Sequence, residues 1–253
     1  MNALFDTVPP AFGAVHLCIL AGVVLVSAAA GLILRRLKEK PLLRLLCVLG
    51  ALMLAAEAWK LWFVSEYVYK GVKTAWFFPW QLCSMAMYCS FIVIFLRGRA
   101  QDAVLVFLAS FSLVAAVAAL VFPGDMLRPQ IALFIHSFTF HTLMVIESLA
   151  AINILARRKR PSFLPAAGLF LIMAAVAEAV NVGSHFYFCP PDIEANMFNI
   201  TPFYPSNQPV FSLVAAKLGI AAEIAIYLAV IILVSFLVYA LENAVLKKRR
   251  SEL

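Results

Sequence analysis

Residues 11–34 read AFGAVHLCILAGVVLVSAAAGLIL, and the basic stretch RRLKEKPLLR follows directly at 35–44. The first stretch contains no Asp, Glu, Lys or Arg. About 20 apolar residues in a helix, at a rise of about 1.5 Å per residue, cross the hydrocarbon core of a bilayer. The pattern therefore predicts a transmembrane helix followed by a positively charged loop.

The composition extends this interpretation to the whole chain. Of 253 residues, 64% are hydrophobic and 13% are charged, and the mean hydropathy is +0.97. Soluble domains contain about 45–50% apolar and about 25% charged residues. We expect an all-α, polytopic seven-transmembrane helix bundle that forms a single domain over residues 1–253, because lipid leaves backbone groups no water to bind. The expected spans are about 11–34, 42–64, 77–96, 103–122, 131–155, 163–182 and 211–241.

The net charge of +7 is unevenly distributed. Basic clusters follow the first, third, fifth and seventh spans, at 35–44, 97–99, 157–160 and 247–250. This alternation is the positive-inside pattern of membrane proteins, so we expect an outer N-terminus and a cytoplasmic C-terminus. It excludes nucleic acid as the reason for the charge and favours membrane lipids as partners. We expect an integral protein of the cell (inner) membrane of a bacterium.

The five cysteines form no CxxC pair and have no zinc-ligand spacing. We therefore expect neither a metal nor a cofactor. Cys189, in the loop after the sixth span, is a candidate free thiol.

Polar side chains inside the predicted spans gather toward the outer side. Ionisable residues in a membrane are costly and often functional. Five spans place such groups at similar depth, and Glu147 alone lies deeper. The candidate site residues are Glu57, Lys60, Gln81, Cys83, His136, His141, Glu178, Asn181, His185, Lys217 and Glu223.

Helical spacing refines this group. Glu57 and Lys60 are three residues apart and can pair, and Glu178, Asn181 and His185 follow one stripe. The 211–241 span contains Ala215 and Gly219, a small-xxx-small pair that predicts close helix packing. The proline-rich loop 183–210 is long enough to act as a lid or binding segment.

Three motifs resemble the YwaF-type integral membrane family, which includes transmembrane protein 164. They are FPWQLCS (78–84), the proline turn and helix FPGDMLRPQIALFIHSFTFHTLM (122–144), and NVGSHFYFCPP with TPFYP (181–191 and 201–205). The sequence has Gln81 where the family has histidine. The resemblance implies a seven-helix fold with an outer N-terminus. For the transmembrane protein 164 branch it implies acyl transfer between phospholipids through a cysteine acyl-enzyme.

Cys83 matches the motif cysteine, so the implied nucleophile is Cys83, with His141 or else His136 as the base. A neighbouring imidazole activates a thiol by taking its proton. Gln81 or Asn181 would donate to the developing oxyanion. Glu178 or Glu57 would orient the histidine.

A transporter or small-molecule binding module is the alternative function. Proton relays and substrate paths also place Glu, His and Lys inside spans, although no inverted repeat is visible in the sequence. Lys217 admits a retinal protein as a third hypothesis, but it lies at the start of its span and the third span has no carboxylate counter-ion.

Overall fold

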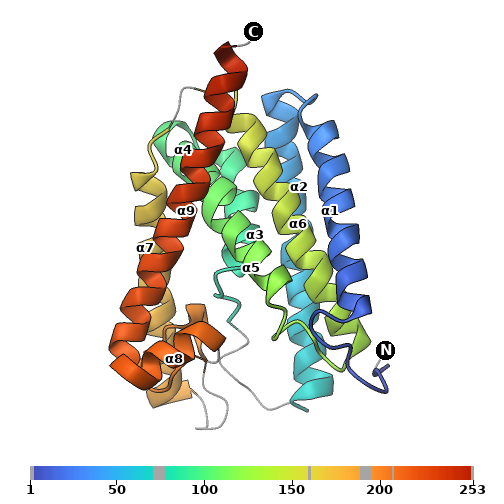
Figure 1. The fold of residues 1–253 in the computed structure, drawn as a ribbon, viewed down its shortest axis with the longest axis vertical. Coiled ribbons are helices and arrows are strands. Elements are labelled where there is room, and N and C mark those ends of the chain that lie inside the picture. Colours follow the sequence, from blue (N-terminus) through green and yellow to red (C-terminus); the bar gives the residue numbers. More distant parts are fainter. Residues whose placement is uncertain (1–2, 71–77, 159–160, 189–194, 207, 252–253) are drawn as a thin grey trace.

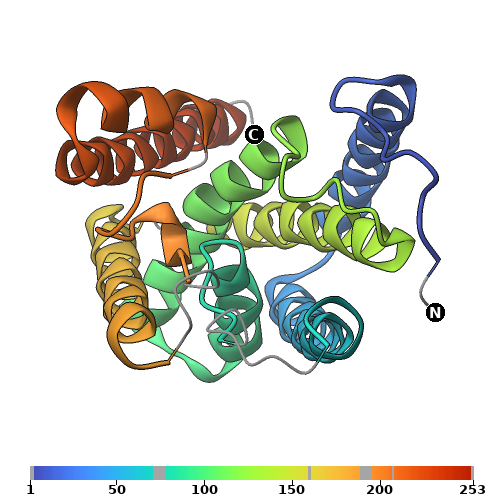
Figure 2. The ribbon, with the colours of Figure 1, turned by 90° about the horizontal axis from the view of Figure 1, so that it is seen from below.

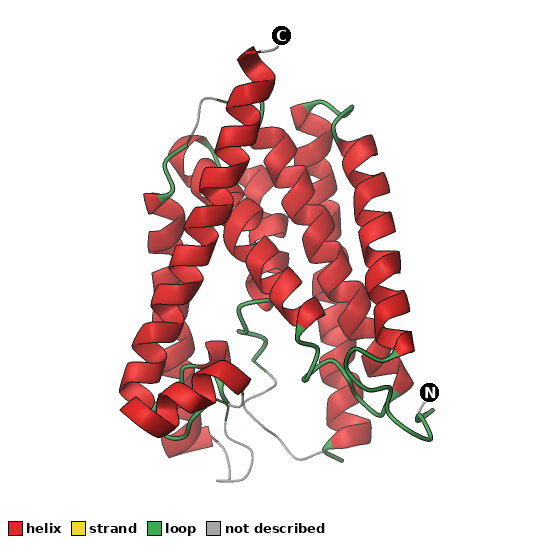
Figure 3. Cartoon of the chain, in the orientation of Figure 1, coloured by secondary structure: helices red, strands yellow, loops and turns green. Residues whose placement is uncertain are grey.

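The computed structural model describes residues 3–70, 78–158, 161–188, 195–206 and 208–251. These residues form an all-helical bundle in which the long helices run roughly parallel or antiparallel and the loops lie at the two ends (Figures 1 and 3). The α-helices are α1 (Ala14–Leu34), α2 (Glu39–Phe63), α3 (Ser84–Ile92), α4 (Gly98–Phe107), α5 (Leu113–Val121), α6 (Ile131–Leu155), α7 (Leu164–Gly183), α8 (Pro209–Leu218) and α9 (Ile220–Ser251). The π-helical turns are η1 (Val64–Val68), η4 (Leu108–Ser112) and η5 (Ser184–Phe188), and the 3-10 turns are η3 (Val93–Phe95) and η7 (Met197–Asn199).

Six helices of the described part are long and apolar enough to cross a membrane. They cover residues 14–34, 39–68, 98–121, 131–155, 164–187 and 220–246. The apolar helix Ser84–Phe95 is shorter. The all-helical, multi-pass architecture is therefore confirmed, and the bounds of the expected fifth span, 131–155, are reproduced.

Two expected spans differ from the structure. The expected span 77–96 is helical only from Ser84 to Phe95, because Pro79 restricts the backbone and the chain first makes a turn. The expected span 211–241 is interrupted at Gly219, which has a φ of +87° and separates α8 from α9. Only glycine adopts this backbone conformation without strain. Gly219 also has no heavy atom within 4 Å of an added Cβ, so the prediction of a small-xxx-small contact there is wrong.

Helix α6 lies at the centre of the bundle. It packs against α1, α2, α3, α4, α5 and η4, and Figure 2 shows it running between α1 and α2 when the bundle is seen from below. By contrast, α1 lies at the periphery and buries only His16 and Leu34. Its other apolar side chains include exposed Val24 and Leu25, as expected of a helix that faces lipid.

The two ends of the bundle differ. Helix α1 begins at the lower end in Figure 1, and α9 ends at the upper end. The α1–α2, α3–α4 and α6–α7 turns also lie at the upper end, whereas the segment 195–206 and α8 lie at the lower end, and the turn before α3 lies between that end and the middle of the bundle. The lower half of the bundle therefore holds the turn, the loop and the helix α8 in which the sequence nominates residues for function.

Candidate functional site

Gln81 and Cys83 lie in the turn that precedes α3. The N–H of Ser84 donates to the carbonyl of Gln81 at 2.9 Å, which starts the helix. Cys83 is half-buried and packs against the hydrophobic core. The two residues therefore stand at the lower end of a short helix and not inside a full-length span.

Two side-chain bonds hold this turn in place. The indole N–H of Trp80 donates to the carbonyl of Met173 in α7 at 3.0 Å. The hydroxyl of Tyr88 donates to the carbonyl of Pro79 at 3.2 Å. Trp80 also stacks on Phe78, with ring centroids 5.5 Å apart. The aromatic residues around the proline thus fix where the Cys83 thiol lies.

Gln81 binds the backbone of a distant loop. Its Nε2 donates to the carbonyl of Asn196 at 3.0 Å, and its Oε1 accepts from the N–H of Phe198 at 2.9 Å. A primary amide that binds one N–H and one C=O imitates the pairing of a β-strand, and it leaves neither backbone group unsatisfied. The backbone of residues 196–198 is therefore the binding partner of the Gln81 side-chain amide.

Asn181 of α7 holds the same loop in the same manner. Its Nδ2 donates to the carbonyl of Met197 at 3.1 Å, and its Oδ1 accepts from the Met197 N–H at 2.6 Å. One turn on, the Ser184 hydroxyl accepts from the N–H of Ala195 at 3.0 Å. The buried segment 195–200 is thus bound from two sides, by the turn before α3 and by the end of α7.

This segment has an unusual backbone. Phe198 is fully buried and has a φ of +57°, and Asn199 has a φ of +58°. A bulky residue in the left-handed region is strained and persists only where its surroundings enforce it. The hydrogen bonds from Gln81 and Asn181 supply that enforcement, because they hold the backbone of residues 196 to 198 directly before and at the strained position.

The remaining titratable candidates, on α7, η5, α8 and α9, differ in what they contact. Glu223, 1% exposed, accepts from the backbone N–H of Ser206 at 3.0 Å, so it too holds the loop. Glu178 is half-buried near Asn181. His185 stacks on Phe203 with centroids 3.6 Å apart. Lys217 is exposed in the last turn of α8, so the structure does not bring it into this group.

A second polar group forms between α2 and α6. Glu57 is 4% exposed and pairs with Lys60, with 2.5 Å between Oε1 and Nζ. Burial is the largest electrostatic influence on His136, His141 and the Cys83 thiol, and the Lys60 ammonium lies close enough to add a smaller one to each. Glu57 adds a further small influence on the thiol, of opposite sign to that of Lys60. These five residues are called the Lys60 group below. They come from α2, α6 and the turn before α3.

The two histidines of the Lys60 group differ in their surroundings. His141 Nδ1 lies 2.8 Å from the carbonyl of Ser137. Because a carbonyl only accepts, Nδ1 carries the proton and Nε2 is left as a basic nitrogen. The ring of His136 lies near the rings of Trp59 and Phe140, with centroid distances of 5.9 and 5.6 Å, and neither of its nitrogens has a hydrogen-bond partner among the described residues.

The candidate residues therefore divide into two neighbouring sets. Gln81, Asn181 and Glu223 bind the chain's own loop, whereas Cys83 belongs to the Lys60 group. Among the described hydrogen bonds, none joins Cys83 to a histidine. Cys189 and residues 190–194 of the 183–210 loop lie outside the described residues. The described part contains no set of three or more His, Cys, Asp and Glu side chains placed to hold a metal ion.

Sequence reasoning did not single out His16. This residue is fully buried on α1; its Nδ1 accepts from the N–H of Phe12 at 3.0 Å, and its Nε2 lies 3.0 Å from the carbonyl of Leu120. The two bonds fix the neutral Nε2–H tautomer. A histidine in an otherwise apolar first span was a signal that could have found this contact.

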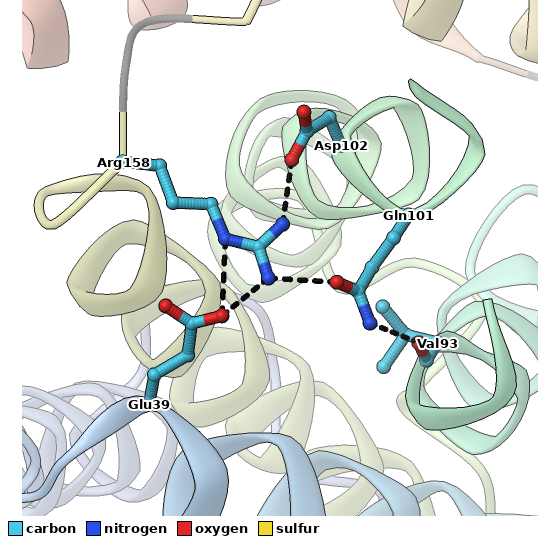
Figure 4. Close-up of polar contacts among 5 residues, drawn as sticks. All are labelled: Glu39, Val93, Gln101, Asp102 and Arg158. Atoms are coloured by element: carbon cyan, nitrogen blue, oxygen red, sulfur yellow. Dashed lines mark hydrogen bonds and ion pairs between the residues drawn. The ribbon is translucent and has the colours of Figure 1, made fainter. Parts of the chain in front are cut away.

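Sequence reasoning also missed a charged cluster at the upper end (Figure 4). The Arg158 guanidinium donates to Glu39 of α2, to Asp102 of α4 at 2.6 Å, and to Gln101 at 2.7 Å. The Gln101 amide in turn donates to the carbonyl of Val93 at 2.9 Å. Burial disfavours the charge of Arg158, but the bonds to Glu39 and Asp102 outweigh it and raise the pKa of the guanidinium.

A model of the TMEM164 family matches residues 11–240. The chain belongs to the TMEM164 family. The match includes both Cys83 and the helix that carries His136 and His141, so the resemblance drawn from the motifs is confirmed. Searches of curated proteins and of solved structures gave no match.

Proposed function

We propose that this TMEM164 family member is a phospholipid acyltransferase or hydrolase that uses Cys83 as nucleophile and His141 as base. The observation that supports the proposal is the basic Nε2 that the contact between Nδ1 and the Ser137 carbonyl leaves on His141, within a family match that also includes Cys83. Nucleophilic catalysis by cysteine needs such a base.

The reaction would proceed in two balanced steps. The Cys83 sulfur attacks the ester carbonyl of a phospholipid while His141 Nε2 takes the thiol proton. The C–O bond then breaks, the lysophospholipid hydroxyl leaves with that proton, and the acyl chain stays on sulfur as a thioester. In the second step a lysophospholipid hydroxyl, or water, attacks the thioester and gives its proton to His141, and the cysteine thiol is regenerated.

Residues around the pair would assist. His136 is the second candidate base, and Lys60, paired with Glu57, supplies positive charge beside the thiol. Gln81 and Asn181 act less directly, because their amides bind the segment 196–198. They position the loop beside the turn that carries Cys83.

The proposed topology has seven crossings, with the N-terminus outside and the C-terminus in the cytoplasm of a bacterial cell membrane. The basic stretches at 35–44 and 97–99, residues 157–158 after α6, and the stretch 247–250 lie at the upper end in Figure 1, which favours this end as cytoplasmic. The Lys60 group, at the other end, then lies near the ester bonds of the outer leaflet. Reporter fusions after residue 36 and after residue 253 test the proposed topology. We expect both reporters to be active in the cytoplasm, and an exported reporter at either position would refute the topology.

Acyl transfer in proteoliposomes tests the mechanism. The purified protein is reconstituted with a fluorescent diacyl phospholipid and a lysophospholipid acceptor, and the transferred acyl chain is followed by chromatography. We expect Cys83→Ala to abolish transfer and His141→Gln to lower it at least about 100-fold, the range of general-base catalysis. Cys18→Ala, on the exposed face of α1, is the matched control and should retain full activity.

The covalent step has its own readout. Acid-quenched wild type should show a mass increase of one acyl chain that hydroxylamine removes, and Cys83→Ala should not. Full transfer by Cys83→Ala overturns the cysteine mechanism. Counterflow uptake of a solute that Cys83→Ala leaves unchanged would instead support the transporter alternative.

A further inference from the structure

Glu147 is a fully buried acidic side chain in the interior of the bundle. It sits on the central helix α6 and is 0% exposed. Neither of its carboxylate oxygens has a hydrogen-bond partner among the described residues. Buried polar groups are satisfied in nearly all folded proteins, so an unpaired carboxyl at such a place needs an explanation.

Ser90 of α3 faces this carboxyl. Its hydroxyl is the polar group that acts on Glu147. Ser90 is also 0% exposed, and its Oγ makes no hydrogen bond at normal distance and angle. Two fully buried oxygen groups from two helices thus lie close enough to interact, and neither has another hydrogen-bond partner among the described residues.

No described cation neutralises the Glu147 carboxyl. Cys89 of α3 is the titratable side chain on which Glu147 acts. The ionisable groups on the helices packed against α6 are bound elsewhere or exposed: His16 bonds Leu120, Glu57 pairs with Lys60, Glu39 and Asp102 pair with Arg158, and Lys40, Arg44 and Arg99 are exposed. On α6 itself, His141 bonds its own helix, and His136 lies about 16 Å from Glu147 along the helix axis.

An isolated carboxylate in an apolar interior is too costly to persist without a neutralising partner. Carboxylate and hydroxyl oxygens are hard ligands that suit small hard cations. We propose that Glu147 and Ser90 form a buried binding site for a small monovalent cation, either a sodium ion or a proton.

This site is separate from the proposed catalytic group. Glu147 follows His136 by eleven residues, which places it about 16 Å further along the α6 axis. The site does not depend on the acyltransferase proposal. Its occupant would neutralise the centre of the bundle, where α6 contacts most of the other helices.

Thermal unfolding of the purified, full-length protein in detergent tests the site. Wild type, Glu147→Gln and Ser90→Ala are compared in NaCl and in choline chloride of equal ionic strength, and at several pH values from about 6 to about 9, because a ligand bound only by the folded state raises the midpoint. Asn153→Ala is the matched control on α6, since its amide bonds only the carbonyl of Leu149 in its own helix.

A sodium site predicts that NaCl raises the wild-type midpoint by several degrees over choline chloride. Ser90→Ala should then need several-fold more sodium for the same rise, and Glu147→Gln should show none. A proton site predicts no difference between the salts, a wild-type midpoint that falls as pH rises, and a weaker fall in Glu147→Gln. If Glu147→Gln does not fold, the dependence of the wild-type unfolding midpoint on sodium and on pH tests the proposal by itself. A wild type that responds to neither sodium nor pH, or a Glu147→Gln variant that responds to both as wild type does, overturns the proposal.

Discussion

Gly50 of α2 lies directly against the backbone of Phe91 in α3. A Cβ added at Gly50 would lie 2.4 Å from the Phe91 nitrogen and 2.8 Å from the carbonyl oxygen of Met87. No real Cβ approaches backbone atoms so closely, and backbone atoms cannot move aside as a flexible side chain does. The contact sets the spacing between α2, which carries Lys60, and α3, which Cys83 directly precedes.

We therefore expect Gly50→Ala to separate α2 from α3 and to destabilise the protein by about 1–3 kcal/mol, the usual cost of overpacking. Gly168→Ala is the control, because an added Cβ there, in the second turn of α7, meets nothing within 4 Å. That variant should be neutral or about 0.5–1 kcal/mol more stable, since alanine favours helix over glycine. Unfolding midpoints in detergent measure both. Equal midpoints for the two variants would contradict the close contact.

The loop held by Gln81 and Asn181 is the second test. Gln81→Leu removes the partners of the Asn196 carbonyl and the Phe198 N–H, both in a buried segment. An unsatisfied buried group costs about 1–3 kcal/mol. We expect faster hydrogen exchange and proteolysis of residues 195–200, with the rest of the bundle unchanged.

Asn181→Leu should have the same effect, because its amide holds Met197. Asn153→Leu is the matched control, since it removes an amide that bonds only its own helix. The double variant Gln81→Leu with Asn181→Leu should cost less than the sum of the two, because one released anchor already frees the segment. Exchange rates that stay at wild-type values in both single variants would refute the anchoring role.

The third prediction concerns His16, which joins the start of α1 to the end of α5. His16→Leu fills the buried position with an apolar side chain but leaves the Leu120 carbonyl and the Phe12 N–H without their partners. We expect the first residues of the chain to detach from the end of α5, and a loss of about 1–3 kcal/mol. Limited proteolysis before Ala14 measures the detachment. Cys18→Ala, exposed on the same helix, should leave the cleavage pattern unchanged.

The helices were largely predictable from the sequence, and their interruptions were not. Hydrophobic length predicts a crossing helix, and the 131–155 prediction matches α6. The break at Gly219 depends on one residue with positive φ, which an apolar run conceals. The turn at 78–83 had a visible signal in Pro79, but length alone still favoured a complete span.

The partners of the candidate residues were harder to predict, for a physical reason. Gln81 bonds backbone groups that lie 115 and 117 positions away. Backbone donors and acceptors exist at every position, so no residue type marks them in advance. The Glu57–Lys60 pair was predictable because both charges lie on one helix at a spacing of three.

The Arg158 cluster provides the last prediction. One guanidinium joins the starts of α2 and α4 to the end of α6, through Glu39 and Asp102 (Figure 4). Arg158→Lys keeps the charge but lacks the planar fork that reaches two carboxylates at once. Because Glu39 and Asp102 are partly exposed, we expect a loss of only about 1 kcal/mol, which decreases as salt screens the pairs.

The contribution of the Arg158 cluster to stability should not depend on pH between about pH 7 and about pH 9. The bonds to Glu39 and Asp102 raise the pKa of the guanidinium, which therefore keeps its charge throughout this range. Arg99→Lys, exposed at the start of α4, is the control. A double-mutant cycle of Arg158→Lys with Asp102→Asn, followed by unfolding at low and high salt, measures the coupling; a coupling of zero at low salt would show that the pair does not join the helices.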